Sequence, residues 1–396
     1  MIRNATGEYH RTTVAGEEVR AFIPFDLPPA NPGLALEGPL AERLRAAERA
    51  LARLDLAGEM VPSLDWFIYA FVRKEAVVSS QIEGTQATLI DLLTFEADER
   101  ATPNADLEEV CNYLDALGYA RGELVKPDGL PLSIRLLNET HRRLMRGVRG
   151  AEKMPGEIRR SQNWIGGTRP GNAVYVPPPP HALAGVLSAF EQYLHATNGL
   201  APLVRAGLLH VQFETIHPYL DGNGRIGRLL ITLLLEHWQL LSKPLLYLSL
   251  FFKRHRDEYY RRLGGVRTGG DWEAWTGFFL EGVTTIADEA IASSRELFAL
   301  VARDRTRLLH DRNVSVGAIR LFEMLPRHPL LSVASTLTLL QTTKPTAARA
   351  IDALVSAEID RRRCGLWSRR AELASGRQDR LQQLLERQNR SKTAAF

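Results

Sequence analysis

Cysteine is scarce in this sequence: its 396 residues include two, Cys111 and Cys364, which lie far apart and form no CxxC pair. Two such thiols exclude a disulfide framework and a zinc site made of cysteines alone. The first residues, MIRNATGEYHRTTV, lack the apolar stretch of a signal peptide. The most apolar run, residues 229–252, is interrupted by charged residues and by Pro244. These interruptions favour a buried helix followed by a loop over a membrane span. We therefore expect a cytoplasmic protein with no membrane contact.

Several common nucleotide and metal motifs are also missing. The sequence contains no GxxxxGK[ST] phosphate loop, no HExxH zinc motif and no repeat of 20–50 residues. The pattern Gly222-x-Gly224-x-x-Gly227 does match GxGxxG. A dinucleotide-binding fold, however, requires a strand before these glycines and a series of alternating strands and helices, which the sequence does not predict.

Composition indicates a folded chain with an uneven distribution of charge. Apolar residues make up 45% and charged residues 24%, and the formal net charge is +4. From residue 301 onward there are 18 Lys and Arg against 9 Asp and Glu, so the first 300 residues carry a net charge of −5. An anionic partner, if the protein has one, is therefore expected to contact the C-terminal part.

Hydrophobic periodicity predicts a mainly α-helical fold in which strands are few. The proline-rich residues 1–38 are expected to follow the surface irregularly. Asp106 and Ser133 are the expected N-caps of two helices, and Gly84 is the expected C-terminal stop of a third. Helices are predicted from Pro39 and at about 63–82, 87–97, 106–121, 133–146, 181–196, 202–216, 225–241 and 270–300.

Residues 155–180 break the helical pattern and are dense in Gly, Pro and Asn. Two short extended pieces, Trp164-Ile165 and Val174-Tyr175-Val176, flank a Pro-Gly-Asn turn. We predict a hairpin-like flap here.

The C-terminal residues predict a separate small unit. Two helical runs, Val333–Leu340 and Thr346–Ala357, are separated by QTTKP and followed by IDRRRCGLWSRR. This order is similar to a helix-turn-helix with a β-wing. The expected domains are an N-terminal segment with helices (1–105), a central core (106–300), a winged-helix-like domain (305–375) and a polar tail (376–396).

Residues 217–228, HPYLDGNGRIGR, contain the groups needed to bind a phosphate chain. Glycines around an asparagine lead directly into an apolar helix, whose first backbone N–H groups favour anions. Arg225 and Arg228 are three residues apart and project toward the same anion. Asp221 would repel that anion unless a Mg²⁺ ion bridged the two, and His217 has a side chain suited to accepting a proton near neutral pH.

This segment resembles the signature of the Fic family, HPFx[D/E]GNGRxxR, with Tyr219 in place of the usual phenylalanine. The resemblance covers roughly residues 100–290. It implies a mostly α-helical protein that binds ATP and Mg²⁺ and transfers AMP to a Ser, Thr or Tyr hydroxyl of a target protein. The hydroxyl of Tyr219 is expected to need a hydrogen-bond partner.

The resemblance also implies roles for individual residues. His217 would be the general base, and Asp221 would hold Mg²⁺. The flap residues Trp164, Ile165, Val174 and Tyr175 would dock a target segment by strand addition. The expected ATP-binding residues are Gly222, Asn223, Gly224, Arg225 and Arg228, with Tyr259 and Tyr260 beside the adenine.

A second signature lies upstream, where Ser79-Ser80-Gln81-Ile82-Glu83-Gly84 fits [S/T]xxxE[G/N]. It resembles the inhibitory helix motif of the same family, with Ser79, Glu83 and Gly84 at the defined positions. The implied mechanism is autoinhibition: Glu83 forms a two-pronged pair with Arg228 and so occupies the guanidinium that the γ-phosphate of ATP requires.

Other interpretations remain open at this point. The chain could instead be a DNA-binding regulator that uses its Fic core as an effector, with Arg361, Arg362 and Arg363 on DNA phosphates. A winged-helix unit could equally dock a protein or form a homodimer. Glu83 could also support removal of AMP from a modified target. The sequence does not name that target.

Overall fold

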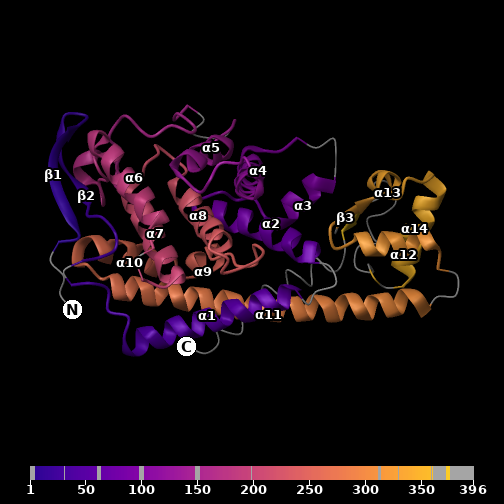
Figure 1. The fold of residues 1–396 in the computed structure, drawn as a ribbon. Helices are drawn as coiled ribbons and strands as arrows, with labels where there is room; N and C mark the ends of the chain where they lie inside the picture. Colours follow the sequence, from indigo (N-terminus) through magenta and orange to yellow (C-terminus); the bar gives the residue numbers. More distant parts are fainter. Residues whose placement is uncertain are drawn as a thin grey trace. The chain divides into compact units, whose positions relative to one another are not determined.

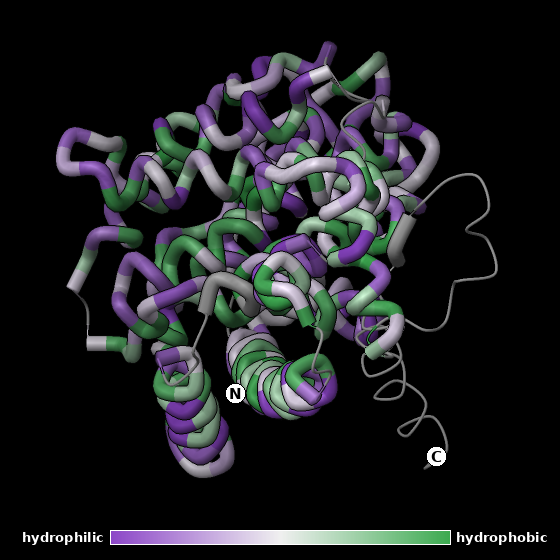
Figure 2. Tube along the Cα trace, turned by 90° about the vertical axis from the view of Figure 1, so that its right-hand side faces the viewer, coloured by the Kyte–Doolittle hydropathy of each residue, from purple (hydrophilic) through white to green (hydrophobic). Residues whose placement is uncertain are grey.

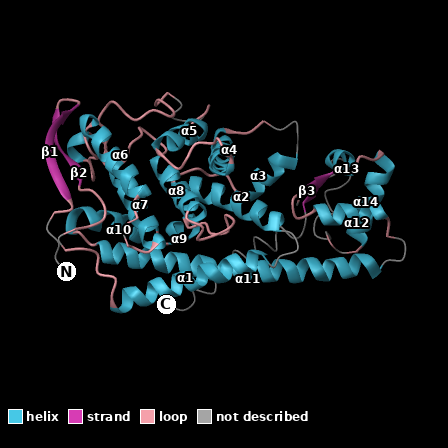
Figure 3. Cartoon of the chain, viewed as in Figure 1, coloured by secondary structure: helices cyan, strands magenta, loops and turns pink. Residues whose placement is uncertain are grey.

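The computed structural model describes residues 5–30, 32–59, 64–97, 102–147, 152–197, 199–310, 314–328, 330–357, 359 and 372–374. Helices account for most of these residues, and the strands form two small two-stranded sheets (Figure 3). The predicted mainly α-helical fold is therefore confirmed. No described helix has both the length and the apolarity to cross a bilayer.

The chain forms two compact units. Unit 1 comprises Met1–Glu59, Glu75–Gln86 and Glu108–Asp288, and unit 2 comprises Met60–Lys74, Ala87–Leu107 and Glu289–Phe396. Unit 1 contains β1 (Gly7–Val14), β2 (Glu17–Pro24), α1 (Gly38–Glu59), α5 (Ile134–Leu144), η1 (Pro170–Asn172), α6 (Pro180–His195), α7 (Pro202–Ile216), α8 (Asn223–His237), α9 (Ser249–Arg254) and α10 (Arg256–Gly269). Unit 2 contains α3 (Leu89–Ala97), α12 (Val316–Met324), β3 (Leu330–Ser332), α13 (Val333–Leu340), α14 (Lys344–Ser356) and β4 (Glu372–Ala374). Three helices contribute residues to both units: α2 (Leu64–Ile82), α4 (Ala105–Val125) and α11 (Trp272–His310).

Helices α7 and α8 lie side by side in the centre of unit 1 (Figure 1). Every residue from Leu203 to Ile216 is buried, including the polar Arg205, His210, Gln212 and Glu214, so α7 is a core helix. Peripheral helices instead alternate hydrophilic and hydrophobic colours along their length, as amphipathic helices do (Figure 2). The loop between α7 and α8, residues 217–222, is therefore supported on both sides by rigid core helices.

An aromatic cluster packs beside α7 and includes Trp272, Trp275, Phe278 and Phe279, all of which are buried. His210 belongs to this cluster and stacks on Trp275 at 5.7 Å between ring centroids. Its Nδ1 donates to the carbonyl of Gly227 at 2.8 Å, and its Nε2 accepts from the hydroxyl of Tyr259 at 2.8 Å. Both nitrogens are thus used in packing, so His210 links α7 to α8 and α10.

The prediction that residues 1–38 are irregular is wrong for Gly7–Pro24. These residues form a regular antiparallel hairpin in which Val14 pairs with Glu17. The two residues between them, Ala15 and Gly16, have φ of 49° and 83°, the positive values that a tight hairpin turn with the right twist requires. Ala-Gly is a weak turn signal compared with Asn-Gly, which explains why the hairpin was not predicted.

The flap is less regular than predicted. Instead of two strands it has one isolated antiparallel bridge, Ile165–Tyr175, and Pro170–Asn172 form a single 3₁₀ turn at its tip. Gly166 and Gly167 have φ of 67° and 75°, which interrupts the extended backbone directly after Ile165. The predicted turn is present, but the strand pairing stops after one residue pair.

One of the two predicted N-caps is confirmed. The hydroxyl of Ser133 accepts from the backbone N–H of Leu136 at 3.3 Å, which caps α5. Asp106, however, is not the cap of α4: Oδ1 of Asn104 accepts from the N–H of Leu107 at 2.8 Å, and the helix begins at Ala105. Gly84 follows α2 with φ of 104°, as expected of a glycine that ends a helix.

In unit 2, helices α12, α13 and α14 share a core that includes Leu321, Phe322 and Ile351. Strand β3 pairs with β4 in antiparallel fashion. The predicted wing, with Arg361, Arg362 and Arg363, and the tail at 376–396 lie outside the described residues. The winged-helix assignment, the DNA contact and the four domain boundaries therefore stay predictions.

Candidate active site

The loop between α7 and α8 is closed by its own residues. His217 ends α7 in a left-handed conformation with φ of 50°, and Gly222 precedes α8 with φ of 75°. Directly after Gly222, Asn223 turns its amide back over the loop: Oδ1 accepts from the N–H of Tyr219 and Nδ2 donates to its carbonyl, both at 2.8 Å. The N–H groups at the start of α8 are therefore held at the mouth of a tight, preformed loop, where they favour an anion.

His217 lies at the start of this loop in an environment that keeps it neutral. Burial, together with the positive charge of Arg159, lowers the pKa of His217 to about 4. Its Nδ1 is buried and has no hydrogen-bond partner among the described residues. A neutral imidazole can accept a proton at neutral pH.

Arg159 anchors the backbone around His217, a role that the sequence did not indicate. Its Nε donates to the carbonyl of His217 at 2.9 Å, its backbone N–H to that of Pro218 at 3.0 Å, and its Nη2 to that of Pro178 at 2.5 Å. The side chain is 2% exposed and burial lowers its pKa to about 10. Arg159 thus ties the flap segment to the loop through backbone carbonyls, which no local sequence pattern reveals.

Asp221 lies at the rim of the loop with its carboxylate 38% exposed. Oδ1 accepts from the N–H of Gly222 at 2.7 Å, and Oδ2 lies 3.0 Å from Nζ of Lys153. Although burial opposes it, the hydrogen bonds from Lys153 and Gly222 hold the pKa of Asp221 below its usual range. The residue is therefore an anionic oxygen donor beside the anion-binding loop.

This donor set fits Mg²⁺ held jointly with a substrate. Among the described residues, no three His, Cys, Asp or Glu side chains gather into a metal site. Magnesium in phosphate-transfer sites is commonly held by one or two carboxylates together with substrate phosphates. Asp221 supplies one such carboxylate, and the loop N–H groups next to it suit the phosphates.

Arg225 lies in the first turn of α8 and is only 4% exposed. Nη1 lies 3.2 Å from Oε2 of Glu109 on α4, a carboxylate that also accepts from the hydroxyl of Thr85 at 2.9 Å. Its Nε is buried without a hydrogen-bond partner among the described residues. The sequence did not predict Glu109 or Thr85, which connect the segment after α2 to the loop.

Arg228 and the end of α2 form the closest contact between the two sequence signatures. Nη2 of Arg228 lies 2.7 Å from Oε1 of Glu83, and its other bonds go to Ser79: Nε to the hydroxyl and Nη2 to the carbonyl, both at 3.0 Å. The predicted Glu83–Arg228 pair is thus present in the structure. It is one-pronged rather than two-pronged, and Nε and Nη2 of Arg228 also bond to Ser79.

The position of Arg228 also stabilises the C-terminal end of α2. The N–H of Glu83 bonds to the carbonyl of Ser80, which leaves the carbonyl of Ser79 free of its usual helical partner. Arg228 donates to that carbonyl and places a positive charge at the negative end of the helix dipole. Burial acts against both charges of the pair, but Arg228 lowers the pKa of Glu83 and Glu83 raises that of Arg228, so the pair is ionised.

Gly224 explains how Glu83 comes so near the loop. A Cβ at this position would lie 2.3 Å from Oε1 of Glu83 and 2.9 Å from Nη1 of Arg228. Only a glycine therefore allows the carboxylate to approach the backbone of the first turn of α8. Glu83 occupies the place where the helix N-terminus attracts an anion.

The hydroxyl of Tyr219 has the partner that the sequence calls for, since it donates to Oδ1 of Asn138 at 2.8 Å. Its ring stacks on His141 at 3.9 Å between centroids and 5° between planes. His141 accepts from the N–H of Gly156 at Nδ1 (2.8 Å), so its Nε2 donates to the carbonyl of Asp221 (3.0 Å). Burial lowers the pKa of His141 to about 4, which keeps this bridge neutral.

The two tyrosines expected beside adenine lie in different environments. Tyr259 is 1% exposed and bonds to His210 inside the aromatic cluster, so its ring belongs to the core. Tyr260 is 45% exposed, and Cζ of Arg256 lies 5.6 Å from its ring centroid. Of the two, only Tyr260 presents a ring to the surface.

The flap is attached to the N-terminal hairpin. Oε2 of Glu17 accepts from Nη1 of Arg169 at 2.6 Å and from the N–H of Gly171 at 3.0 Å, and the N–H of Phe22 donates to the carbonyl of Val176 at 2.9 Å. The predicted docking residues divide by exposure: Trp164 (38%) and Val174 (81%) face outward, Ile165 is half-buried, and Tyr175 is buried.

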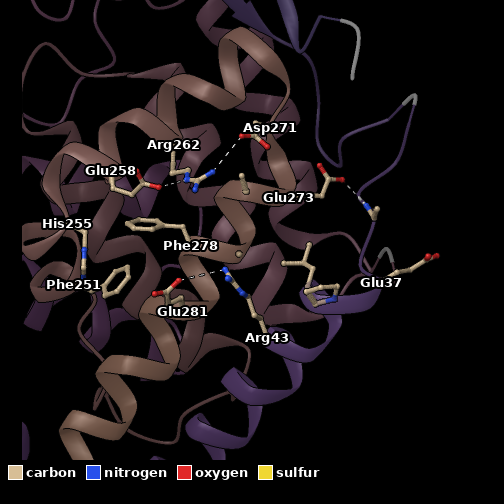
Figure 4. A pocket seen from close by; sticks show the side chains of 15 residues that line it. Glu37, Arg43, Phe251, His255, Glu258, Arg262, Asp271, Glu273, Phe278 and Glu281 are labelled. Atoms are coloured by element: carbon tan, nitrogen blue, oxygen red, sulfur yellow. Dashed lines mark hydrogen bonds and ion pairs between the residues drawn. The ribbon is translucent and has the colours of Figure 1, made fainter. Parts of the chain in front are cut away.

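A separate cavity of about 620 Å³ lies among α1, α9, α10 and α11, and none of its lining residues comes from the loop (Figure 4). Five carboxylates line it, and two arginines pair with three of them. Arg43 lies 3.7 Å from Glu281, and Arg262 lies 2.6 Å from Glu258 and 3.7 Å from Asp271. This cavity does not contribute to the phosphate-binding arrangement.

Comparison with protein families agrees with these features. Residues 41–121 match the Fic/DOC family N-terminal domain, and residues 131–235 match the Fic/DOC family. The chain therefore carries a Fic N-terminal domain and a Fic domain, which confirms the resemblance stated from the sequence.

Curated proteins and solved structures that carry the Fic name are similar to this chain. The chain is 33% identical over 243 residues to "Protein adenylyltransferase Fic" of Drosophila willistoni, covering 57% of this chain and 45% of that protein. It is 34% identical over 187 residues to the protein of that name from Drosophila grimshawi, and the match covers 46% of this chain and 35% of that protein. It thus spans less than half the length of either relative.

Among solved structures, a Fic family protein from Desulfovibrio desulfuricans superposes with a TM-score of 0.54 at 21% identity, covering 82% of this chain and 91% of that one. A Fic domain containing signaling protein from Bacteroides thetaiotaomicron gives a TM-score of 0.51 at 18% identity, and the superposition covers 62% of this chain and 95% of that one. These similarities establish the Fic fold.

Proposed function

We propose that this protein transfers AMP from ATP to a hydroxyl side chain of a target protein, and that Glu83 holds this activity in check. The main observation in support of this proposal is the position of Glu83, whose carboxylate lies against Gly224 and Arg228 at the start of α8, where an anion is favoured. The relatives named as protein adenylyltransferases support the reaction class.

His217 would act as the general base. Because its pKa is lowered to about 4, the imidazole is neutral at pH 7 and can take the proton of the attacking hydroxyl. The hydroxyl oxygen would form a bond to the α-phosphorus, the bond from that phosphorus to the bridging oxygen would break, and pyrophosphate would leave. Arg225 and the first N–H groups of α8 would stabilise the negative charge that develops on the phosphate oxygens.

Asp221 would hold Mg²⁺ together with the phosphates of ATP. When bound, the ion would offset charge on the leaving pyrophosphate. The protein's own contribution is to present a carboxylate next to the loop and to hold it there through the N–H of Gly222.

Inhibition would arise from competition for Arg228. A γ-phosphate bound there would be repelled by the carboxylate of Glu83, which lies 2.7 Å from the guanidinium. ATP would then bind with its α-phosphate misaligned for attack by the target hydroxyl. Release of α2 from this contact would free Arg228 for the γ-phosphate.

The test is incubation of wild type, Glu83→Gly and His217→Ala with α-³²P-labelled ATP and Mg²⁺. Label on protein should rise for Glu83→Gly and be lost for His217→Ala. Label transferred from γ-³²P-labelled ATP instead would mean phosphate transfer and would overturn AMP transfer as the function. Absence of label from either nucleotide, in Glu83→Gly with a cell extract supplied as target, would also reject the proposal.

A further inference from the structure

Lys153 is the one charged group bonded to the Asp221 carboxylate among the described residues, and neither sequence signature includes it. Its Nζ lies 3.0 Å from Oδ2 of Asp221, and both side chains are partly exposed, at 45% and 38%. An exposed ion pair of this kind contributes little to stability, so its position beside the anion-binding loop calls for another explanation.

The backbone around the pair is fixed independently of the pair. His141 accepts from the N–H of Gly156 and donates to the carbonyl of Asp221, so it joins the turn that carries Lys153 to the loop that carries Asp221. Tyr219 stacks on the same ring and is itself anchored to Asn138. The lysine stem therefore starts close to Asp221 whether or not the ammonium is bonded to it.

A bare carboxylate at this place would oppose phosphate binding. Asp221 precedes the first N–H groups of α8, where an anion is favoured, and its negative charge would repel a phosphate group at short range. A cation that offsets that charge therefore strengthens the binding of a phosphate chain. A divalent ion is one such cation, and the ammonium of Lys153 already provides another.

We infer that Lys153 is a nucleotide-site residue that neutralises Asp221 when no divalent ion is bound, so that the loop can bind a diphosphate without metal. This inference rests on the proposed ATP site and names a further residue of it. When a divalent ion takes Asp221, the flexible stem of Lys153 can move the ammonium away, because nearly half of the side chain is in solvent. The lysine is thus needed for metal-free binding and dispensable for binding with metal.

The experiment is calorimetric titration of ADP, which lacks the γ-phosphate that Glu83 would oppose, into wild type and variants with either EDTA or saturating Mg²⁺. In EDTA, Lys153→Met should weaken ADP binding by roughly 10-fold, the effect of about one unbalanced charge near a phosphate. In Mg²⁺ the same variant should bind ADP like wild type. Lys153→Arg, which keeps the charge, should bind like wild type in both.

Lys126→Met is the matched control, because it removes another exposed lysine paired to a carboxylate, with Nζ of Lys126 2.6 Å from Oε1 of Glu123. It should change neither titration. Equal affinities of wild type and Lys153→Met in EDTA would overturn the inference, and so would wild type that binds ADP only with Mg²⁺. If wild type binds ADP in neither buffer, the nucleotide site itself, and with it the proposed function, is rejected.

Discussion

Arg228 bonds to Ser79 at two atoms, the hydroxyl and the backbone carbonyl, and to Glu83 at one. The arginine that pairs with Glu83 is therefore also the C-terminal cap of α2. Loss of Glu83 leaves the cap in place, whereas loss of Arg228 removes the cap and the ion pair together. This difference leads to opposite expectations for the two substitutions.

We expect Glu83→Gly to raise the initial rate of AMP transfer and Arg228→Ala to lower it. Glu83→Gly should raise the rate on the order of 10-fold or more. A hydrogen bond between charged groups contributes about 1.5–3 kcal/mol, and this substitution removes that contribution from the state in which Glu83 pairs with Arg228. Arg228→Ala removes the partner of the γ-phosphate. Initial rates at saturating ATP measure both, and Arg121→Ala serves as the control, since it breaks a different partly buried pair with Glu236. A gain in both variants would show that Arg228 serves inhibition alone.

Tyr219→Phe should lower the free energy of unfolding by about 1–2 kcal/mol, because Oδ1 of Asn138 would lose its donor. The ring and its stacking on His141 would remain, so the rate of AMP transfer should stay close to that of wild type. Urea unfolding measures the first quantity. Replacing Asn138 as well, in Tyr219→Phe/Asn138→Leu, should recover most of the loss, and an equal or larger loss in the double variant would contradict this explanation.

His210 should make stability depend on pH in a direction that the structure defines. Burial lowers its pKa to about 3 from the usual 6.5, so the unfolded chain takes up a proton at pH values where the folded chain does not. The stability of wild type relative to His210→Phe should therefore fall as the pH falls from about 6.5 toward about 3, by roughly 1.4 kcal/mol per pH unit. Comparing the two proteins cancels the other titrating groups. A constant difference between neutral pH and about pH 5 would mean that folding leaves the pKa of His210 unshifted.

Glu17→Ala should loosen the flap. The carboxylate accepts two hydrogen bonds from the flap tip, so its loss should speed hydrogen exchange at the amides of Ile165 and Val174 by roughly 10-fold, about 1.4 kcal/mol. Glu18→Ala is the matched control, since it breaks an exposed pair with Arg11 (3.4 Å) and does not touch the flap. Equal exchange in the two variants would show that the flap is held by other contacts.

Much of the site could be predicted because its residues are contiguous. The loop from His217 to Arg228 has local geometry that follows from glycines, a helix start and the order of charged side chains. The pair between Glu83 and Arg228 spans 145 residues and was reached through the family resemblance. No periodicity or spacing argument would have joined these two positions.

The remaining parts depend on tertiary placement. Arg159, Glu109 and Lys153 each reach the site from a different segment, and each acts through a contact that the neighbouring sequence does not encode. The N-terminal hairpin was missed for a local reason, since Ala15 takes a positive φ that alanine rarely adopts. Tyr259 was assigned to the nucleotide through the family resemblance, and its burial in the aromatic cluster cannot be read from the sequence.

The side-chain amide of Asn223, bonded to both backbone polar groups of Tyr219, has a thermodynamic consequence. The loop is already ordered in the free protein, so little conformational entropy remains to be lost when a ligand binds. Asn223→Ala would move that entropy loss from folding to binding. Nucleotide affinity would fall through a less favourable binding entropy, even though the lost side chain need not contact the nucleotide.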